Sequence, residues 1–193
     1  MNKVPALLVT CCLTLLQAAS SNVSLPQFNT ETEEYNVYSA VLRRLHRPPA
    51  NKSMMIVNHS LSPVDHDLLF DKSNRDEPFP SIITLTNYIK VNKQAREISD
   101  EFDTEYKHAM LSKKELEDIF KDGCCGWNLF YERYPGSSGY VSFSRVGFNG
   151  NATQALVYVV CVCGGLCGTG GYVLLEKKGG TWRTQRWLAS WIS

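Results

Sequence analysis

The C-terminal part of the chain, residues 139 to 192, is patterned as a run of β-strands separated by turn signals. The segment GYVSFSRVGF alternates between two sets of side chains, which is typical of a half-buried strand. The segment QALVYVVCVC is apolar almost throughout, which favours a central strand, and the GG after GYVLLEKK is typical of a tight hairpin turn. We therefore predict four antiparallel strands paired in chain order, near residues 139–148, 154–163, 171–178 and 181–192.

The N-terminal half is patterned mainly as helices. Thr30 and Glu33 have the spacing of a capping box, and apolar residues at helical spacing follow them until two prolines stop the helix. Residues 82–94 mix β-branched residues with helical spacing, and we favour a helix there. Ser112 and Glu115 start a further capping-box helix over residues 112–123.

Two shorter features complete the pattern of the N-terminal half. Residues 53–60 form a short apolar run suited to a strand, and the polar, proline-containing residues 61–80 read as a loop. Helices first and an antiparallel sheet last predict an α+β fold, in which N-terminal helices pack on a C-terminal antiparallel β-meander. We expect residues 21–193 to form a single domain, since that length supports one sizeable core.

The first twenty residues have the composition of a signal peptide. Lys3 provides a positive start, residues 4–16 are apolar but too few to span a bilayer, and Ala18, Ala19 and Ser20 offer a cleavage site. A buried first helix is the structural alternative, and a lipoprotein signal at Cys11 fits less well because Thr10 precedes it. We expect residues 1–20 to be removed, the protein to be secreted or periplasmic, and no transmembrane anchor to remain.

The charge balance bears on the class of partner. The chain has 20 Lys and Arg against 19 Asp and Glu, and loss of Lys3 with the signal leaves 19 of each. A neutral mature chain argues against nucleic acid or an anionic membrane as the main partner. The expected partner is therefore an unidentified small molecule or protein.

Five cysteines remain after the signal, three of them in the stretch CVCGGLCGTGG. Zinc would need a fourth ligand and lacks the usual C-x2-C knuckle, while a redox pair would favour C-x-x-C at a helix start. Cys163 and Cys167 instead flank a glycine-rich interval between two strands, and we predict a disulfide across that turn. Cys161 could bond Cys124 or Cys125, or it could be a small buried residue.

No catalytic, metal or cofactor site is evident in the sequence. His66 lies between Asp65 and Asp67, but successive residues of an extended chain point apart, so a solvated loop is the better interpretation. His46, His59 and His108 stand alone. We therefore assign no catalytic residues, no metal ligands and no cofactor.

The C-terminal block resembles that of a family of uncharacterised, exported bacterial proteins. The resembling pieces are FYERYPGSSG, FSRVGFN, QALVYV, GYVLLEKKGGTW and the closing WIS. The last hairpin is also similar to that of nuclear-transport-factor-2-like folds. The first resemblance implies export and brings no known activity.

These observations favour a secreted or periplasmic, non-enzymatic binding domain whose ligand contacts the apolar face of the sheet. One alternative is a hydrolase or thiol enzyme that uses His66, His108 or a free cysteine. Another is a structural envelope protein.

Overall fold

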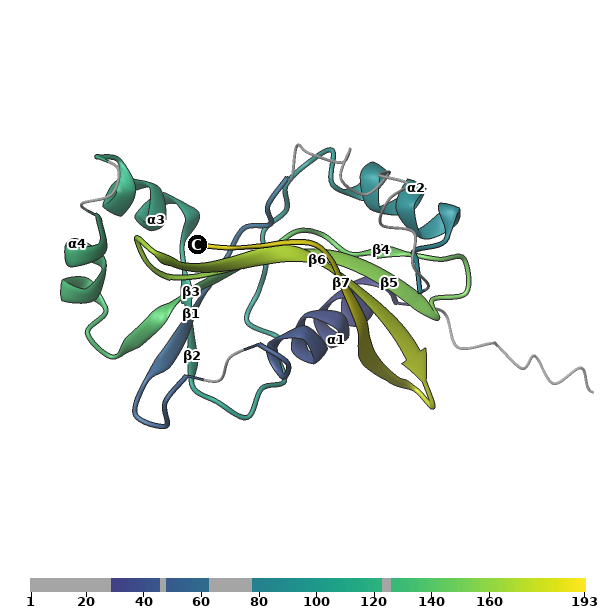
Figure 1. Ribbon diagram of the computed structural model, residues 1–193, viewed down its shortest axis with the longest axis horizontal. Helices are drawn as coiled ribbons and strands as arrows, with labels where there is room; N and C mark the ends of the chain where they lie inside the picture. The colour runs from purple at the N-terminus through teal and green to yellow at the C-terminus, as the bar shows by residue number, and fades with distance from the viewer. Residues whose placement is uncertain (1–28, 46–47, 63–77, 123–125) are drawn as a thin grey trace, which may run out of the picture.

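The computed structural model describes residues 29–45, 48–62, 78–122 and 126–193, and it has an α+β fold (Figure 1). Four helices and a mixed seven-stranded sheet make up this described part. In chain order the elements are α1 (Thr30–Leu42), β1 (Ser53–Val57), α2 (Ile82–Val91), β2 (His108–Leu111), α3 (Lys113–Phe120), α4 (Gly126–Arg133), β3 (Ser137–Phe143), β4 (Gly147–Phe148), β5 (Gln154–Gly164), β6 (Cys167–Lys178) and β7 (Thr181–Ile192). The predicted signal peptide, residues 1–20, lies outside the described residues.

The sheet is mixed, which corrects the expectation of a purely antiparallel sheet. Its strand order is β2-β1-β3-β5-β6-β7, with β4 also paired to β5. Strands β3, β5, β6 and β7 pair antiparallel, whereas β1 pairs parallel to both β2 and β3. Parallel neighbours need long crossover connections. The segments that contain α2, and then α3 and α4, provide these connections.

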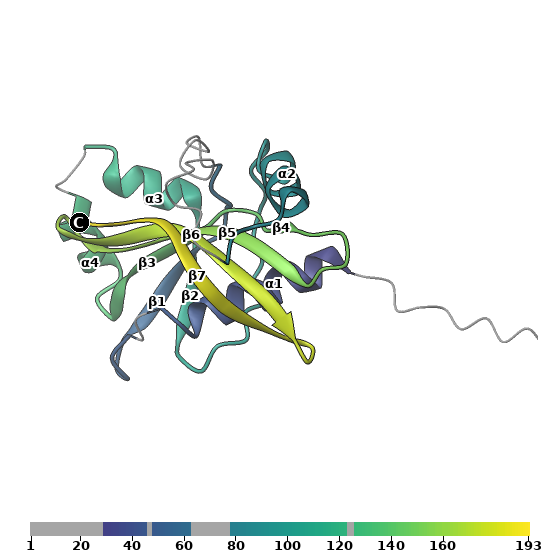
Figure 2. The same cartoon turned by 45° about the vertical axis from the view of Figure 1, so that its right-hand side comes forward.

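The sheet separates two helical layers (Figures 1 and 2). Successive residues of a strand point to opposite faces. In β1, Met54 and Ile56 join the core beneath α1, whereas Met55 and Val57 pack towards α3 and α4. Helix α1 therefore covers one face of the sheet, and α2, α3 and α4 cover the other.

The core on the α1 face is the largest of the three apolar clusters. Its members on α1 have the helical spacing expected from the sequence, and they meet buried residues from β1, β3, β5 and β6. Tyr38 packs against Phe143, with ring centroids 4.8 Å apart, and its hydroxyl donates a hydrogen bond to the carbonyl of Ser144. This contact fixes α1 on the centre of the sheet.

On the opposite face, α2 lies unusually close to β4. A side chain at Gly147 would place its Cβ 2.6 Å from the backbone nitrogen of Tyr88. Tyr88 is fully buried and packs edge-on against Tyr172 of β6. Gly147 is thus the residue that allows α2 to approach the sheet.

The helix starts agree with the sequence in part. Helix α2 confirms the helical interpretation of residues 82–94, and the predicted Ser112–Glu115 capping box is present on α3. The predicted box at α1 is wrong, because Asn29 caps that helix. Glu33 is unavailable for capping, since its carboxylate accepts hydrogen bonds from Lys177 and Trp182 on β6 and β7.

Two further features bear on the sequence predictions. Gly179 and Gly180 both have positive φ, of 56° and 80°, as the predicted GG turn between β6 and β7 requires.

No helix within the described residues has the length and apolar character needed to cross a bilayer.

Candidate groove at the β5–β6 hairpin

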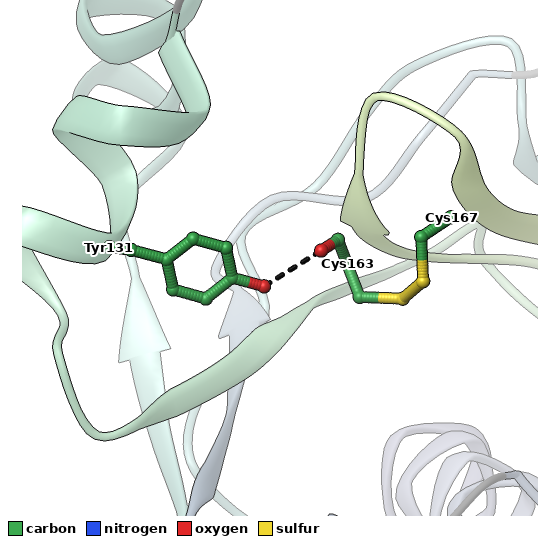
Figure 3. Close-up of a disulfide and its surroundings, with 3 residues drawn as sticks. All are labelled: Tyr131, Cys163 and Cys167. Carbon is green, nitrogen blue, oxygen red and sulfur yellow. Dashed lines mark hydrogen bonds between the residues drawn. A yellow bond between two sulfur atoms is a disulfide. The ribbon is translucent and has the colours of Figure 1, made fainter.

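The hairpin that joins β5 to β6 holds the cysteine-rich stretch. It closes with a two-residue turn, Gly165–Leu166, because Gly164 pairs with Cys167 across the ladder. A register shift between Val162 and Gly164 displaces Cys163 from a direct cross-strand position. Cys163 and Cys167 nevertheless lie at disulfide distance, with their Cα atoms 5.1 Å apart (Figure 3).

The end of β5 is held by contacts from outside the hairpin. The hydroxyl of Tyr131, on α4, donates a 2.8 Å hydrogen bond to the carbonyl of Cys163 (Figure 3). Gly139 of β3 has a φ of 110°, and a Cβ there would lie 2.9 Å from the Cα of Cys163. Burial, together with the nearby Cys161, raises the pKa of the Tyr131 hydroxyl, so it remains a donor at neutral pH. The hairpin base is therefore anchored from α4 and β3.

Cys161 has no disulfide partner among the described residues. Its suggested partners, Cys124 and Cys125, lie outside them, so the second disulfide stays a prediction. Burial raises the pKa of the Cys161 thiol. The thiolate is the nucleophilic form, so a raised pKa makes this thiol a poor nucleophile at neutral pH.

Cys161 lies within a row of side chains that crosses the sheet on the α1 face. Pairing places Val141, Cys161, Thr169 and Ile192 opposite one another on β3, β5, β6 and β7, and Ile56 of β1 opposite Val141. The row starts in the core, where Ile56 and Val141 are fully buried, and ends at Ile192, which is 88% exposed. The apolar face of the sheet thus continues to the surface at this end.

A groove of about 340 Å³ lies over this end of the row. We call it the hairpin groove; its lining residues are Met54, Ser138, Cys161, Cys163, Leu166, Cys167, Gly168, Thr169, Ile192 and Ser193. The hairpin lies at the opposite end of the sheet from the β6–β7 turn (Figure 1). Leu166, at the tip, is 91% exposed. The groove is mainly apolar, and Ser138, Thr169 and Ser193 also line it. The hydroxyls of Ser138 and Thr169 donate hydrogen bonds to the backbone carbonyls of Ser53 and Trp191.

A metal site at the hairpin cysteines would need a further ligand, and the cysteines considered for it, Cys124 and Cys125, lie outside the described residues. Among the described residues, no three His, Cys, Asp or Glu side chains come close enough to hold an ion. Cys161, Cys163 and Cys167 all line the hairpin groove.

Of the four histidines, two lie in the described part of the chain. His108 accepts or donates at both ring nitrogens: Nε2 lies 2.7 Å from the carboxylate of Asp100, and Nδ1 lies 3.1 Å from the hydroxyl of Thr104. The Thr104 hydroxyl is also placed to donate to the carbonyl of Tyr106. His59 lies in an isolated bridge with Glu97, and the remaining two, His46 and His66, fall outside the described residues.

Sequence reasoning identified the cysteines of the groove but missed Met54, Tyr131, Thr169 and Ile192. Strand alternation alone groups residues within one strand, whereas the register between strands places Thr169 opposite Cys161 and Ile192 opposite Thr169. Tyr131 lies on α4, which was not predicted, although GWNLFYER contains the apolar spacing of a helix.

Comparison with family models, with curated proteins and with solved structures finds no match to this chain. The function is therefore inferred from the geometry of the protein itself.

Proposed function

We propose that this protein is an exported, non-enzymatic binding domain that takes a small apolar ligand in the hairpin groove. The observation that carries the proposal is the row of mainly apolar side chains that leaves the core and ends in the hairpin groove. The groove volume, about 340 Å³, falls within the roughly 300–1,000 Å³ typical of small-molecule sites. A few polar groups on an apolar surface usually orient such a ligand, and the oxygens of the Ser138 and Thr169 hydroxyls can still accept hydrogen bonds from it.

The chemistry of the groove supports binding rather than reaction. Burial raises the pKa of the Cys161 thiol, so this lining residue stays protonated and uncharged at neutral pH. The cysteine pair and the Tyr131 hydrogen bond both restrain the hairpin. A groove that is already ordered loses less conformational entropy on binding.

A neutral fluorescent dye, Nile red, provides the direct test. We expect saturable binding to the mature protein and displacement of the dye by decanol. Ile192→Ser should weaken dye binding at least fivefold, because it removes an exposed apolar wall of the groove. Ile82→Ser is the matched control, since Ile82 is 70% exposed but lies on α2, on the other side of the sheet. Absence of saturable binding, or an equal loss in both variants, would contradict the proposal.

Export forms a separate part of the proposal. It rests on the charge, apolar length and small residues of positions 1–20 and on the resemblance of the C-terminal block to exported bacterial proteins. We expect mass spectrometry of secreted protein to find the N-terminus between Ser20 and Asn22. An intact Met1 on mature material would contradict export with cleavage.

A second candidate function, hydrolysis, is favoured by the chain of contacts from Thr104 through His108 to Asp100. A hydroxyl, an imidazole and a carboxylate in sequence can form a nucleophile, a base and an orienting group. Against this, the Thr104 hydroxyl has one proton and is also placed to donate it to the Tyr106 carbonyl. Turnover of p-nitrophenyl acetate that Thr104→Val abolishes would favour the enzyme; no turnover by the wild-type protein would remove this candidate. If the protein neither binds Nile red nor turns over p-nitrophenyl acetate, a structural role in the cell envelope becomes the favoured function.

A further inference from the structure

The β5–β6 turn and the last residues of β7 form an exposed apolar end of the sheet. We call it the hairpin tip and define it as Gly165, Leu166 and residues 190–193. The pairing of β6 with β7 brings these two pieces to the same end of the sheet (Figures 1 and 2). Leu166 and Ile192 are the two most exposed large apolar side chains in the described part of the chain.

The two segments that form the hairpin tip contain no charged side chain. Residues 146–175, which include β5 and most of β6, have no Asp, Glu, Lys, Arg or His, and residues 187–193 have none either. Burial explains this in the middle of the strands, but the turn and the end of β7 are exposed. Exposed positions are where charged residues normally lie, and 20% of the chain is charged. The hairpin tip is therefore an exposed surface without the charges that would favour contact with water.

The apolar side chains of the tip lie on both faces of the sheet. Ile192 is on the α1 face, where it pairs with Thr169 and lines the hairpin groove. Trp191 is on the opposite face, where its Nε1 atom donates a 3.0 Å hydrogen bond to the hydroxyl of Tyr158, which packs against the cluster beneath α2. Leu166 lies at the turn itself. A protein partner would cover one of these faces, whereas lipid can surround the tip on every side.

The tip is held in place before it meets any partner. Cys163 and Cys167 lie at disulfide distance at the base of the turn, and the Tyr131 hydroxyl donates to the carbonyl of Cys163. A close approach between Trp191 and Gly170 holds the end of β7, since a Cβ at Gly170 would lie 2.6 Å from the indole Nε1. Insertion of such a tip requires little ordering of the chain, which lowers the entropic cost of binding.

We propose that the hairpin tip inserts shallowly into the surface of a zwitterionic lipid bilayer. Exposed apolar patches mark interaction sites for proteins or membranes, and exposure on both faces favours a membrane here. Tryptophan is typical of the membrane–water interface, and the N–H of Trp191 keeps its partner when the ring enters lipid. Strand β7 has no further strand beyond it in the described sheet, and unpaired backbone groups are costly in hydrocarbon, so insertion stops at the headgroup level.

Co-sedimentation with phosphatidylcholine vesicles tests the proposal on the mature protein. We expect binding that persists at high salt, because no charged side chain of the tip takes part. Leu166→Gln should weaken partitioning about tenfold, because it removes an apolar side chain that lipid would bury. Ile82→Gln is the matched control, since Ile82 is exposed on α2, and it should bind as the wild type does.

Three results of this experiment would overturn the proposal. The first is absence of binding to phosphatidylcholine vesicles, and the second is an equal loss in the Leu166 and Ile82 variants. The third is binding that appears only with anionic lipid and disappears at high salt, which would show that charges elsewhere on the protein hold the membrane.

Tryptophan fluorescence of the vesicle-bound wild-type protein guards against variants that fail to fold. Trp191 is the most exposed of the four tryptophans. Lipids brominated near the headgroup should quench its emission more than lipids brominated near the ends of the acyl chains. Trp191→Phe should remove most of the quenching and still bind, because phenylalanine is also apolar. Unquenched emission from bound wild-type protein would refute insertion of the tip.

Two further controls separate this proposal from its alternatives. Analytical ultracentrifugation without lipid should find a monomer; a dimer that Leu166→Gln dissociates would assign the tip to a second copy of the chain and overturn the proposal. Membrane binding does not depend on a ligand in the hairpin groove. The Nile red titration contains no lipid, so failure of dye binding and failure of vesicle binding are distinguishable.

Discussion

Replacement of Glu34 tests how α1 is held on the sheet. Its side chain, 5% exposed, lies 3.4 Å from Arg96 and 3.3 Å from Arg145 and accepts a 3.2 Å hydrogen bond from the backbone N–H of Val146. The Arg145 contact lacks hydrogen-bond alignment and is therefore mainly coulombic. Glu34→Ala leaves a buried N–H without an acceptor and two guanidinium groups without their shared carboxylate.

The size of the effect follows from the exposure of the partners. Loss of one member of a fully buried ion pair costs about 3–5 kcal/mol of the free energy of unfolding. The Arg96 and Arg145 side chains are 38% and 23% exposed, so water replaces part of the lost interaction. We expect Glu34→Ala to lower the free energy of unfolding by about 3 kcal/mol, which corresponds to about 6–12 °C in Tm.

Two further variants separate charge from hydrogen bonding. Glu34→Gln keeps an acceptor for the Val146 N–H and should lose about half as much stability. Glu31→Ala is the matched control, because Glu31 also pairs with Arg96 but is 53% exposed, and it should cost less than about 1 kcal/mol.

Urea denaturation followed by circular dichroism measures all three variants through the midpoint, with the slope m checked for constancy. The reasoning fails if Glu34→Ala lies within about 1 kcal/mol of the wild type, or if Glu34→Gln is as damaging as Glu34→Ala.

Three other outcomes are expected. Non-reducing peptide mapping of oxidised protein should recover a peptide that contains Cys163 and Cys167 and is lighter than the reduced peptide by two hydrogens. Replacing both cysteines with serine should lower the free energy of unfolding by at most about 2 kcal/mol, since only four positions separate them. Burial would raise the pKa of Glu33, but hydrogen bonds from Lys177 and Trp182 and the charge of Lys177 outweigh it, so the pKa is lowered. The ionised carboxylate therefore stabilises the fold at pH values above the unfolded-state pKa, and this stabilisation is lost as the pH falls through the folded-state pKa. A pH titration of the free energy of unfolding should be flatter below about pH 5 for Glu33→Gln than for the wild type, and an unchanged profile would contradict this. Gly147→Ala should destabilise by about 1–3 kcal/mol, because its Cβ would meet the backbone of Tyr88, and stability equal to wild type in thermal unfolding would show that α2 can shift freely.

The C-terminal strands were predictable in part, because their signals are local, although the strand expected over residues 139–148 is two strands, β3 and β4. Alternation, the apolar run of β5 and the GG turn each lie within a dozen residues of the strand they define. The register shift near Cys163 was not predictable, and because of it Gly164, rather than Cys163, pairs with Cys167. A bulge inserts one residue into one strand and leaves little trace in composition.

The parallel strands illustrate what the sequence leaves open. The apolar run of β1 indicates a strand but says nothing about its partners, β2 and β3. Strand β2, with only four residues, is too short for periodicity to identify. The groove depends on register across β3, β5, β6 and β7, so its cysteines were visible in the sequence but its walls were not.

The parallel pairing of β1 also has a consequence for the order of folding. Strands β5, β6 and β7 are neighbours in the chain and close short loops, whereas β1 must find β3 across about eighty residues, which is entropically slower. We expect the C-terminal hairpins to become protected early in pulse-labelled hydrogen exchange, and β1 and β2 to gain protection only later. A nascent or truncated chain that ends before β3 would therefore expose the apolar residues of β1 on both faces, with the attendant risk of aggregation.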